Sequence, residues 1–161
     1  MKKFKKIISL PFVLLIFFFS NVVTAETKLL STQKAWKAYS TKIKKGKTCF
    51  ITSEPIKTVG KFNKENRGKP YVFVTNTKGG TNHEVSIKAG FNFKRNHDVI
   101  FDVDGKKTKL FPVDDRAWSE SSKTDRYLVQ SMRKGKKLII TGTSSPGNKV
   151  IDTYSLSGFT K

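Results

Sequence analysis

The sequence contains few of the residues that usually carry metal or redox chemistry. Its 161 residues include one cysteine, Cys49, and two histidines, His83 and His97. Neither histidine has a partner at the spacing of a zinc site, so we expect both in surface loops. A single cysteine cannot form a disulfide within its own chain. Residues 48–51 are typical of a strand, so we favour burial of Cys49 over a disulfide to another chain. We predict no metal and no cofactor.

Catalytic signatures are also missing. The chain has no Gly-x-Ser-x-Gly nucleophile turn, no phosphate-binding loop and no dinucleotide fingerprint. Residues 102–105, Asp-Val-Asp-Gly, begin like a calcium loop, but two lysines follow and the twelfth position has no glutamate. We therefore predict a protein that is not an enzyme. The least favoured alternative is a hydrolase that brings together dispersed groups such as Asp114, Asp115 and His97.

One long apolar run is present, and it lies at the N-terminus. Four lysines in residues 2–6 precede an apolar stretch, 7–19, and Val23 and Ala25 are small residues at the positions that signal peptidase recognises. A membrane-spanning helix needs about 20 apolar residues, and this run is shorter. The sequence therefore predicts a signal peptide cleaved after Ala25. We expect export to the periplasm, with secretion or association with the outer membrane as alternatives.

Acidic residues are scarce relative to basic ones. The chain has 32 lysines and arginines against 12 acidic residues; four of the basic residues precede Ala25, and all the acidic ones follow it. The domain after the cleavage site therefore has 28 basic and 12 acidic residues, a net charge of +16. This charge favours an anionic envelope partner: lipopolysaccharide, an anionic lipid or an acidic glycan, with peripheral membrane association at most. Export argues against nucleic acid, and a lysine-rich compositional bias is the alternative explanation.

Three clusters of basic residues are the candidate surface for an anionic ligand. They comprise Lys94 and Arg95; Lys106, Lys107 and Lys109; and Arg133, Lys134, Lys136 and Lys137. Phe91 and Phe93 precede the first cluster and alternate with Asn92, a pattern that more often indicates a core face than a platform for stacking bases.

Short β-forming segments between turn signals predict an all-β, mainly antiparallel fold. We expect a sandwich or a partly open barrel of about seven or eight strands. The Asp104-Gly105 pair predicts a tight hairpin between residues 99–103 and 106–111. One short helix is expected near 124–134, capped by Thr124 or Asp125 and ended by Gly135 in the C′ position. Residues 26–35 are expected to be a loose lead-in to a single domain, 36–161, and residues 57–69 a long exposed loop.

An ordered set of short motifs runs along the predicted domain. It begins with Trp36-x-x-Tyr39 and Cys49-Phe50-Ile51, continues through Val85-Ser86-Ile87-x-x-Gly90, Asp102 to Lys107, Ala117-Trp118 and Leu128-Val129-x-x-Met132-x-x-Gly135, and ends with Gly142 to Ser145 and Asp152-Thr153-Tyr154-Ser155-Leu156-x-Gly158-Phe159. In this order the motifs resemble the invasion-associated locus B family of alphaproteobacterial exported proteins. The resemblance implies a periplasmic or envelope-associated protein of a Gram-negative bacterium. It implies no catalytic residues, and its name offers a second reading: a secreted or surface factor in host-cell interaction. Some branches have paired cysteines, which this chain lacks.

Overall fold

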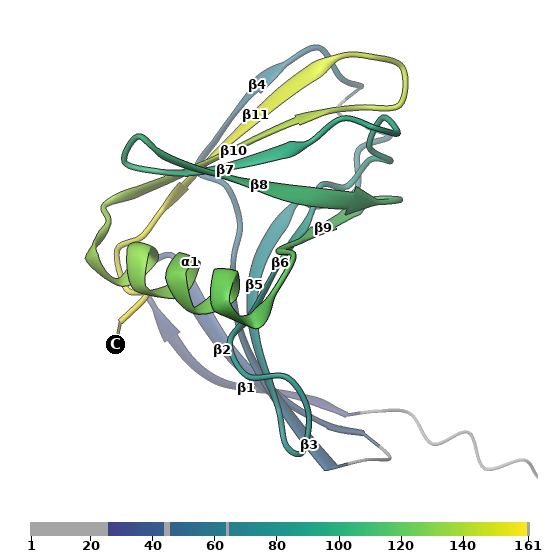
Figure 1. The fold of residues 1–161 in the computed structure, drawn as a ribbon. Coiled ribbons are helices and arrows are strands. Elements are labelled where there is room, and N and C mark those ends of the chain that lie inside the picture. The colour runs from purple at the N-terminus through teal and green to yellow at the C-terminus, as the bar shows by residue number, and fades with distance from the viewer. Residues whose placement is uncertain (1–25, 44–45, 64, 161) are drawn as a thin grey trace, which may run out of the picture.

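The computed structural model describes residues 26–43, 46–63 and 65–160, which form a β-rich fold with one helix (Figure 1). In chain order the elements are β1 (Thr27–Gln33), β2 (Trp36–Ile43), β3 (Gly46–Ser53), β4 (Lys57–Gly60), β5 (Tyr71–Thr77), β6 (Glu84–Lys88), β7 (Val99–Val103), β8 (Lys106–Val113), β9 (Arg116–Trp118), α1 (Ser122–Lys134), β10 (Lys137–Thr143) and β11 (Lys149–Ser155).

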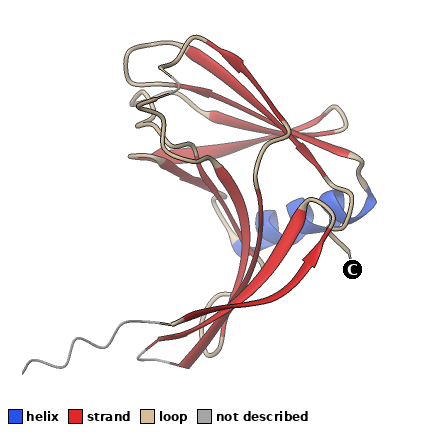
Figure 2. Cartoon of the chain, turned by 180° about the vertical axis from the view of Figure 1, so that it is seen from behind, coloured by secondary structure: helices blue, strands red, loops and turns tan. Residues whose placement is uncertain are grey.

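All the strands join one antiparallel sheet that is not closed. Their order is β1-β2-β3-β5-β6-β9-β8-β7-β10-β11-β4. Strand β8 connects the two halves, because its end, 111–113, pairs with β9 and its beginning, 106–110, pairs with β7. The two halves face each other across an angle, and α1 lies within that angle (Figure 2). The prediction of an all-β, mainly antiparallel fold with one short helix is therefore confirmed.

Three strands are additional to the seven or eight that we expected. The lead-in prediction for residues 26–35 is wrong, because β1 occupies 27–33 and pairs with β2 from Thr27↔Thr41 to Gln33↔Trp36. The loop prediction for 57–69 is wrong at its start, because β4 pairs with β11. The third, β9, has only three residues. All seven residues of β1 are exposed, so neither face of this strand needs to be apolar. Its sequence therefore lacks the alternation of apolar and polar residues that indicates a half-buried strand.

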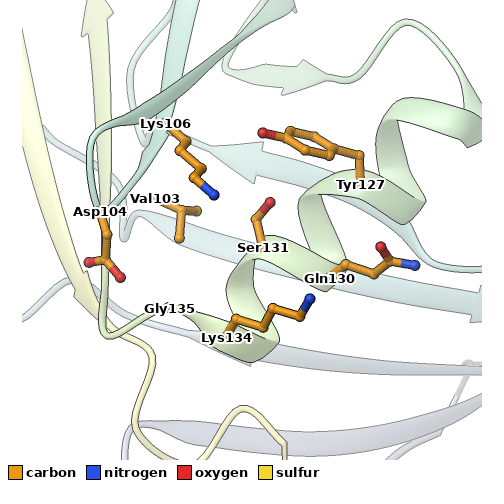
Figure 3. Close-up of a pocket in the computed structure, with 8 residues that line it drawn as sticks. All are labelled: Val103, Asp104, Lys106, Tyr127, Gln130, Ser131, Lys134 and Gly135. Atoms are coloured by element: carbon orange, nitrogen blue, oxygen red, sulfur yellow. The ribbon is translucent and has the colours of Figure 1, made fainter.

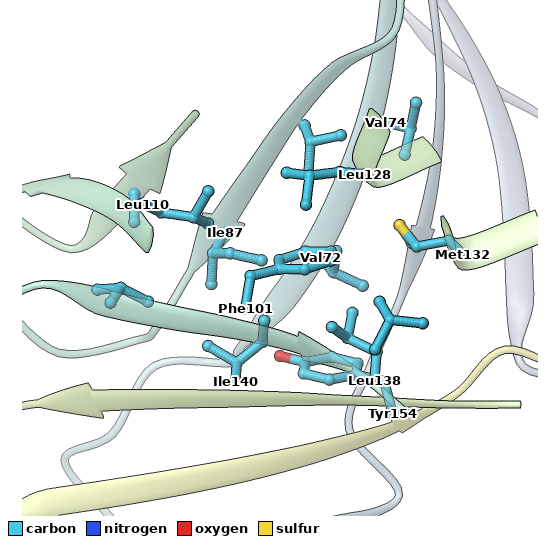
Figure 4. Packing of buried hydrophobic residues seen from close by; sticks show 14 of the residues in the cluster. Val72, Val74, Ile87, Phe101, Leu110, Leu128, Met132, Leu138, Ile140 and Tyr154 are labelled. Carbon is cyan, nitrogen blue, oxygen red and sulfur yellow. The ribbon is translucent and has the colours of Figure 1, made fainter. Parts of the chain in front are cut away.

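The core fills the angle between the two halves of the sheet (Figure 4). From the first half come Val72 and Ile87, and from the second come Phe101 and Tyr154, all at most 1% exposed. From α1, Leu128 and Met132 reach the same cluster. Burial of side chains of this size stabilises the fold by roughly 1.5–3 kcal/mol each, so α1 is fixed by its packing.

The predicted hairpin is confirmed. Val103 pairs with Lys106, which leaves only Asp104 and Gly105 in the turn. Both have positive φ, 48° and 94°, as a two-residue type I′ turn requires. Asp102 stabilises the turn, because its Oδ1 accepts a hydrogen bond of 2.7 Å from the Gly105 N–H.

The ends of α1 correct two details of the prediction. The N-cap is Ser121, whose Oγ accepts from the Thr124 N–H at 3.2 Å, and not Thr124 or Asp125. Gly135 does end the helix, but its φ of −85° and ψ of 165° are extended and not left-handed. A glycine is needed there for space, because a Cβ would lie 2.5 Å from Val103 Cγ1 and 2.9 Å from Leu156 Cδ1.

A buried ion pair fixes the segment between β4 and β5. The Arg67 guanidinium donates to both carboxylate oxygens of Asp152 on β11, at 3.1 and 2.5 Å, and both side chains are only 6% exposed. Arg67 Nε also donates to the Ala89 carbonyl at 2.9 Å, and the rings of Phe62 and Phe91 lie 4.9 and 5.1 Å from the guanidinium carbon. Buried charges need such complete pairing, so this contact holds an otherwise irregular segment against the sheet.

The first and last motifs of the sequence meet in space. Trp36, at the start of β2, is 2% exposed, and its indole Nε1 donates to the Ser155 carbonyl at 3.0 Å. The Phe159 ring packs edge-on against Trp36, with 4.8 Å between ring centroids. The tryptophan and the closing motif therefore form one structural unit that joins β2 to the end of β11.

Candidate functional site

Six of the nine predicted basic residues gather where α1 ends. Lys106 and Lys107 begin β8, Arg133 and Lys134 form the last turn of α1, and Lys136 and Lys137 lead into β10. All six are exposed. We call this set of six residues the basic end.

The Asp104 carboxylate links the β7–β8 hairpin to the segment that follows α1. Asp104, at the tip of the β7–β8 hairpin, accepts from the Lys136 N–H at 2.8 Å and the Lys137 N–H at 3.1 Å. Because Gly135 has no side chain, the helix end can approach Val103 and Asp104 closely. The hairpin and the end of α1 therefore have a fixed relative position.

A pocket of about 220 Å³ lies between the hairpin and the helix. Lys106 from the strand and Lys134 from the helix both line it; the Lys106 side chain extends toward Ser131, and the Lys134 side chain extends toward Gln130 (Figure 3). Tyr127 and Gln130 complete the helical wall. Two ammonium groups, a hydroxyl, a phenol and an amide thus line one small space and can donate hydrogen bonds, and the Asp104 carboxylate lines it as well.

The charge of the basic end remains positive after its acidic neighbours are counted. Asp102 and Asp104 are the carboxylates of the hairpin, and both accept hydrogen bonds from backbone N–H groups. The C-terminus of a helix carries roughly half a negative charge, which the two residues of the last turn offset. Six basic groups against two carboxylates leave a clear excess of positive charge.

The other three predicted residues lie elsewhere. Lys109 forms an exposed ion pair with Asp98 at 2.7 Å, and this hydrogen bond raises the pKa of Lys109. Lys94 and Arg95 line a separate hollow with Asp114 and Ser145, and the Lys94 N–H donates to the Thr143 carbonyl at the far end of β10. Six residues of strand separate that end from Lys137, which corresponds to about 20 Å. The nine residues therefore do not form one continuous surface.

The groups considered for a hydrolase do not converge. His97 is exposed, with its Nδ1 3.0 Å from the Arg95 carbonyl oxygen. Asp114 lines the hollow that also contains Lys94 and Arg95, but neither His97 nor Asp115 lines it. Within the described ranges, no group of three or more His, Cys, Asp or Glu residues could hold a metal ion. His83 is exposed as well, as expected of a surface loop residue.

Cys49 lies in β3, as its neighbours predicted, and is half-buried. It faces a largely apolar hollow of about 310 Å³ whose lining includes Ile51, Val74, Val129 and Phe159. The prediction of burial is therefore correct in part.

Sequence reasoning missed the uncharged residues of the basic end. Tyr127, Gln130 and Ser131 follow the spacing of one helix face and end at Lys134, so a helical projection of the predicted helix could have grouped them. The role of Asp104 could not be found in this way, because its partners, Lys136 and Lys137, lie more than thirty residues away in the chain.

These features define a class: an open antiparallel β protein with one helix and a basic pocket at the end of that helix. Within the described residues, no helix has the length and apolar character needed to cross a membrane. A family model described as invasion associated locus B (IalB) protein matches residues 36–161. The chain belongs to this family, which is not a known family of enzymes. Comparisons with curated proteins and with solved structures give no match.

Proposed function

We propose that this protein is an exported, non-enzymatic accessory protein of the cell envelope that binds an anionic partner at its basic end. The observation that carries the proposal is that Lys106 and Lys134, from two separate elements, line the same pocket. The signal peptide expected in residues 1–25 supports the compartment, and it lies outside the described residues.

The size of the pocket limits what enters it. About 220 Å³ is less than the roughly 300–1,000 Å³ of typical small-molecule sites. A single phosphate, sulfate or carboxylate group fits this space, with the rest of the partner outside it. The nearby Lys107, Lys136 and Lys137, together with Arg133, which lines the hollow that Cys49 faces, then attract further anionic groups of a lipopolysaccharide, an anionic bilayer or an acidic glycan.

The test is a binding measurement in low and in physiological salt. Protein purified from cells that express the full chain is mixed with lipopolysaccharide, with phosphatidylglycerol vesicles and with alginate. We expect binding to at least one of the three, and this binding should weaken steeply with salt because exposed charges are screened over about 8 Å at 0.15 M. The double variant Lys106→Gln/Lys134→Gln should lose most of it.

The matched control removes two lysines elsewhere. Lys28 on β1 and Lys57 on β4 are exposed edge-strand residues, so Lys28→Gln/Lys57→Gln causes the same change in net charge. Equal loss in both double variants would show that overall charge and not the pocket carries the binding. No binding to any of the three probes at low salt would refute the anionic partner.

The family name supplies a second candidate, a secreted or surface factor in host-cell interaction. Fractionation of cells into periplasm, outer membrane and medium separates the two. Protein found only in the soluble periplasm would count against the second candidate, whereas protein in the medium would favour it.

A further inference from the structure

A second pocket lies at the other end of α1 and has a different chemistry. Its volume is about 270 Å³, and its lining includes Phe111, Trp118, Glu84, Glu120 and Asp125. Phe111 and Trp118 are cross-strand partners on β8 and β9, with ring centroids 6.3 Å apart. Phe111 is 44% exposed, so the aromatic wall is open to a ligand. We call this the acidic aromatic pocket.

Asp125 is the least expected member of the lining. It is only 8% exposed, and its Oδ1 accepts from the Val85 N–H at 2.9 Å and from the Ser119 hydroxyl at 2.6 Å. These two hydrogen bonds hold the carboxylate in place at the pocket wall, where it contributes a nearly buried negative charge.

The charge of this pocket is opposite to that of the protein. Three carboxylates line it, and no lysine or arginine does, in a chain with 32 basic residues. The N-terminus of α1 contributes roughly half a positive charge, which offsets only part of the three negative ones. Asp98 and, to a smaller extent, Glu120 raise the pKa of Lys109, whose ammonium group lies 2.7 Å from Asp98 and outside the pocket lining.

We propose that the acidic aromatic pocket binds an organic ammonium group, either an amine or a quaternary ammonium. Cations are attracted to aromatic faces, most strongly to tryptophan, and aromatic walls are the usual means of binding quaternary ammonium groups. The carboxylates of Glu84, Glu120 and Asp125 supply the counter-charge. This site goes beyond the anion binding proposed above, because it lies at the opposite end of α1 and takes the opposite charge.

Two other ligand classes fit less well. A neutral sugar gains nothing from three carboxylates, one of which is nearly buried. A divalent metal needs several oxygen ligands that converge, and the residues that the structure describes contain no such group.

The experiment follows the two tryptophan indole N–H signals by NMR, with the protein purified from cells that express the full chain. Trp118 lines the pocket, whereas Trp36 is buried with its N–H bonded to Ser155 and provides an internal reference. Choline, ethanolamine and the neutral choline analogue 3,3-dimethylbutan-1-ol are titrated at constant ionic strength. We expect the Trp118 signal to shift saturably with one or both ammonium compounds, the Trp36 signal to stay still, and the neutral analogue to have little effect.

The two ammonium probes distinguish the sources of the ligand. A stronger response to ethanolamine would show that the pocket prefers primary amines, such as those of amino sugars, lysine side chains or ethanolamine headgroups. A stronger response to choline would show that the pocket prefers quaternary ammonium headgroups. An equal response to the neutral analogue, or no saturable response to either cation, would overturn the proposal and leave the basic end unaffected.

Variants make the test specific. Glu84→Gln and Asp125→Asn each remove one charge, and we expect each to weaken binding about three- to tenfold. Glu65→Gln is the matched control, because Glu65 is exposed in the segment between β4 and β5 and does not line the pocket. If Asp125→Asn fails to fold, Glu84→Gln and Glu120→Gln carry the test. A loss in the control as large as in the pocket variants would contradict the site.

Discussion

The two ends of α1 differ in charge and in how their residues come together. The basic end uses Lys106, Arg133, Lys134 and their neighbours, which already form clusters in the sequence. The acidic aromatic pocket combines Glu84, on β6, with residues of β8, β9 and the start of α1. A charge cluster in the sequence can be found by inspection, whereas a pocket made from four separate elements depends on the register of the sheet.

Each end also complements the dipole of the helix. Asp125 lies in the first turn of α1, and Arg133 and Lys134 lie in the last. Such placements typically stabilise a helix by about 0.3–1 kcal/mol each. Stabilisation of the helix accounts for these three residues, but not for Lys106 on β8 or Glu84 on β6. Lys106 adds positive charge to the basic end, and Glu84 adds negative charge to the acidic aromatic pocket. Because neither residue belongs to the helix, their positions favour ligand sites over helix stabilisation alone.

The largest effect is expected from a change remote from both ends. Arg67→Met leaves the Asp152 carboxylate buried without its partner, and we expect the free energy of unfolding to fall by about 3–5 kcal/mol. Urea denaturation measures this change. Because neither end of α1 contains Arg67, the folded variant should keep the charge of both pockets. A loss below 1 kcal/mol would mean that the ion pair does not hold the segment between β4 and β5.

A smaller effect is expected at the basic end from Gly135→Ala. The added Cβ would lie against Val103 and Leu156, so we expect a loss of about 1–3 kcal/mol and a shift of the hairpin away from the helix. Anion binding should fall in the folded variant, while the Trp118 signal keeps its response to cations. Unchanged stability and unchanged anion binding would show that the close approach of helix and hairpin is not required.

The smallest effect is expected at the opposite end from Ser121→Ala. The variant loses the hydrogen bond that the serine Oγ accepts from the Thr124 N–H, which should cost about 1 kcal/mol. Thermal unfolding measures it, and Ser122→Ala, one residue inside the helix, is the control. Cation binding should weaken slightly, and anion binding should not change. An equal loss in the control would argue against Ser121 as the cap.

Local features of the fold followed directly from the sequence. The hairpin at Asp104-Gly105 could be predicted because positive φ at two adjacent positions needs those residue types. The helix was predicted from its apolar spacing and its glycine, although its cap was placed three or four residues too late. Strands β1 and β4 were missed, because they lie at the edges of the sheet and carry mostly exposed side chains.

Long-range contacts could not be predicted from the pattern of residues. The partners Arg67 and Asp152 lie 85 residues apart, and they come together because Arg67 follows β4, which pairs with β11. The same holds for Asp104 with the backbone of Lys136 and Lys137. Six of the nine basic candidates do meet, because three separate elements end at the same place. Lys94, Arg95 and Lys109 do not join them.

The central claim is that the two ends of α1 bind ligands of opposite charge, and the most direct test is a pair of amide NMR titrations of the full protein. Inorganic phosphate is added to one sample, and choline is added to a second sample at the same ionic strength. The account predicts that phosphate shifts the amides of residues 104–107 and 131–137, and that choline shifts those of residues 82–85 and 118–125. The account would be contradicted if both ligands shifted the same amides, or if neither ligand shifted either group of amides.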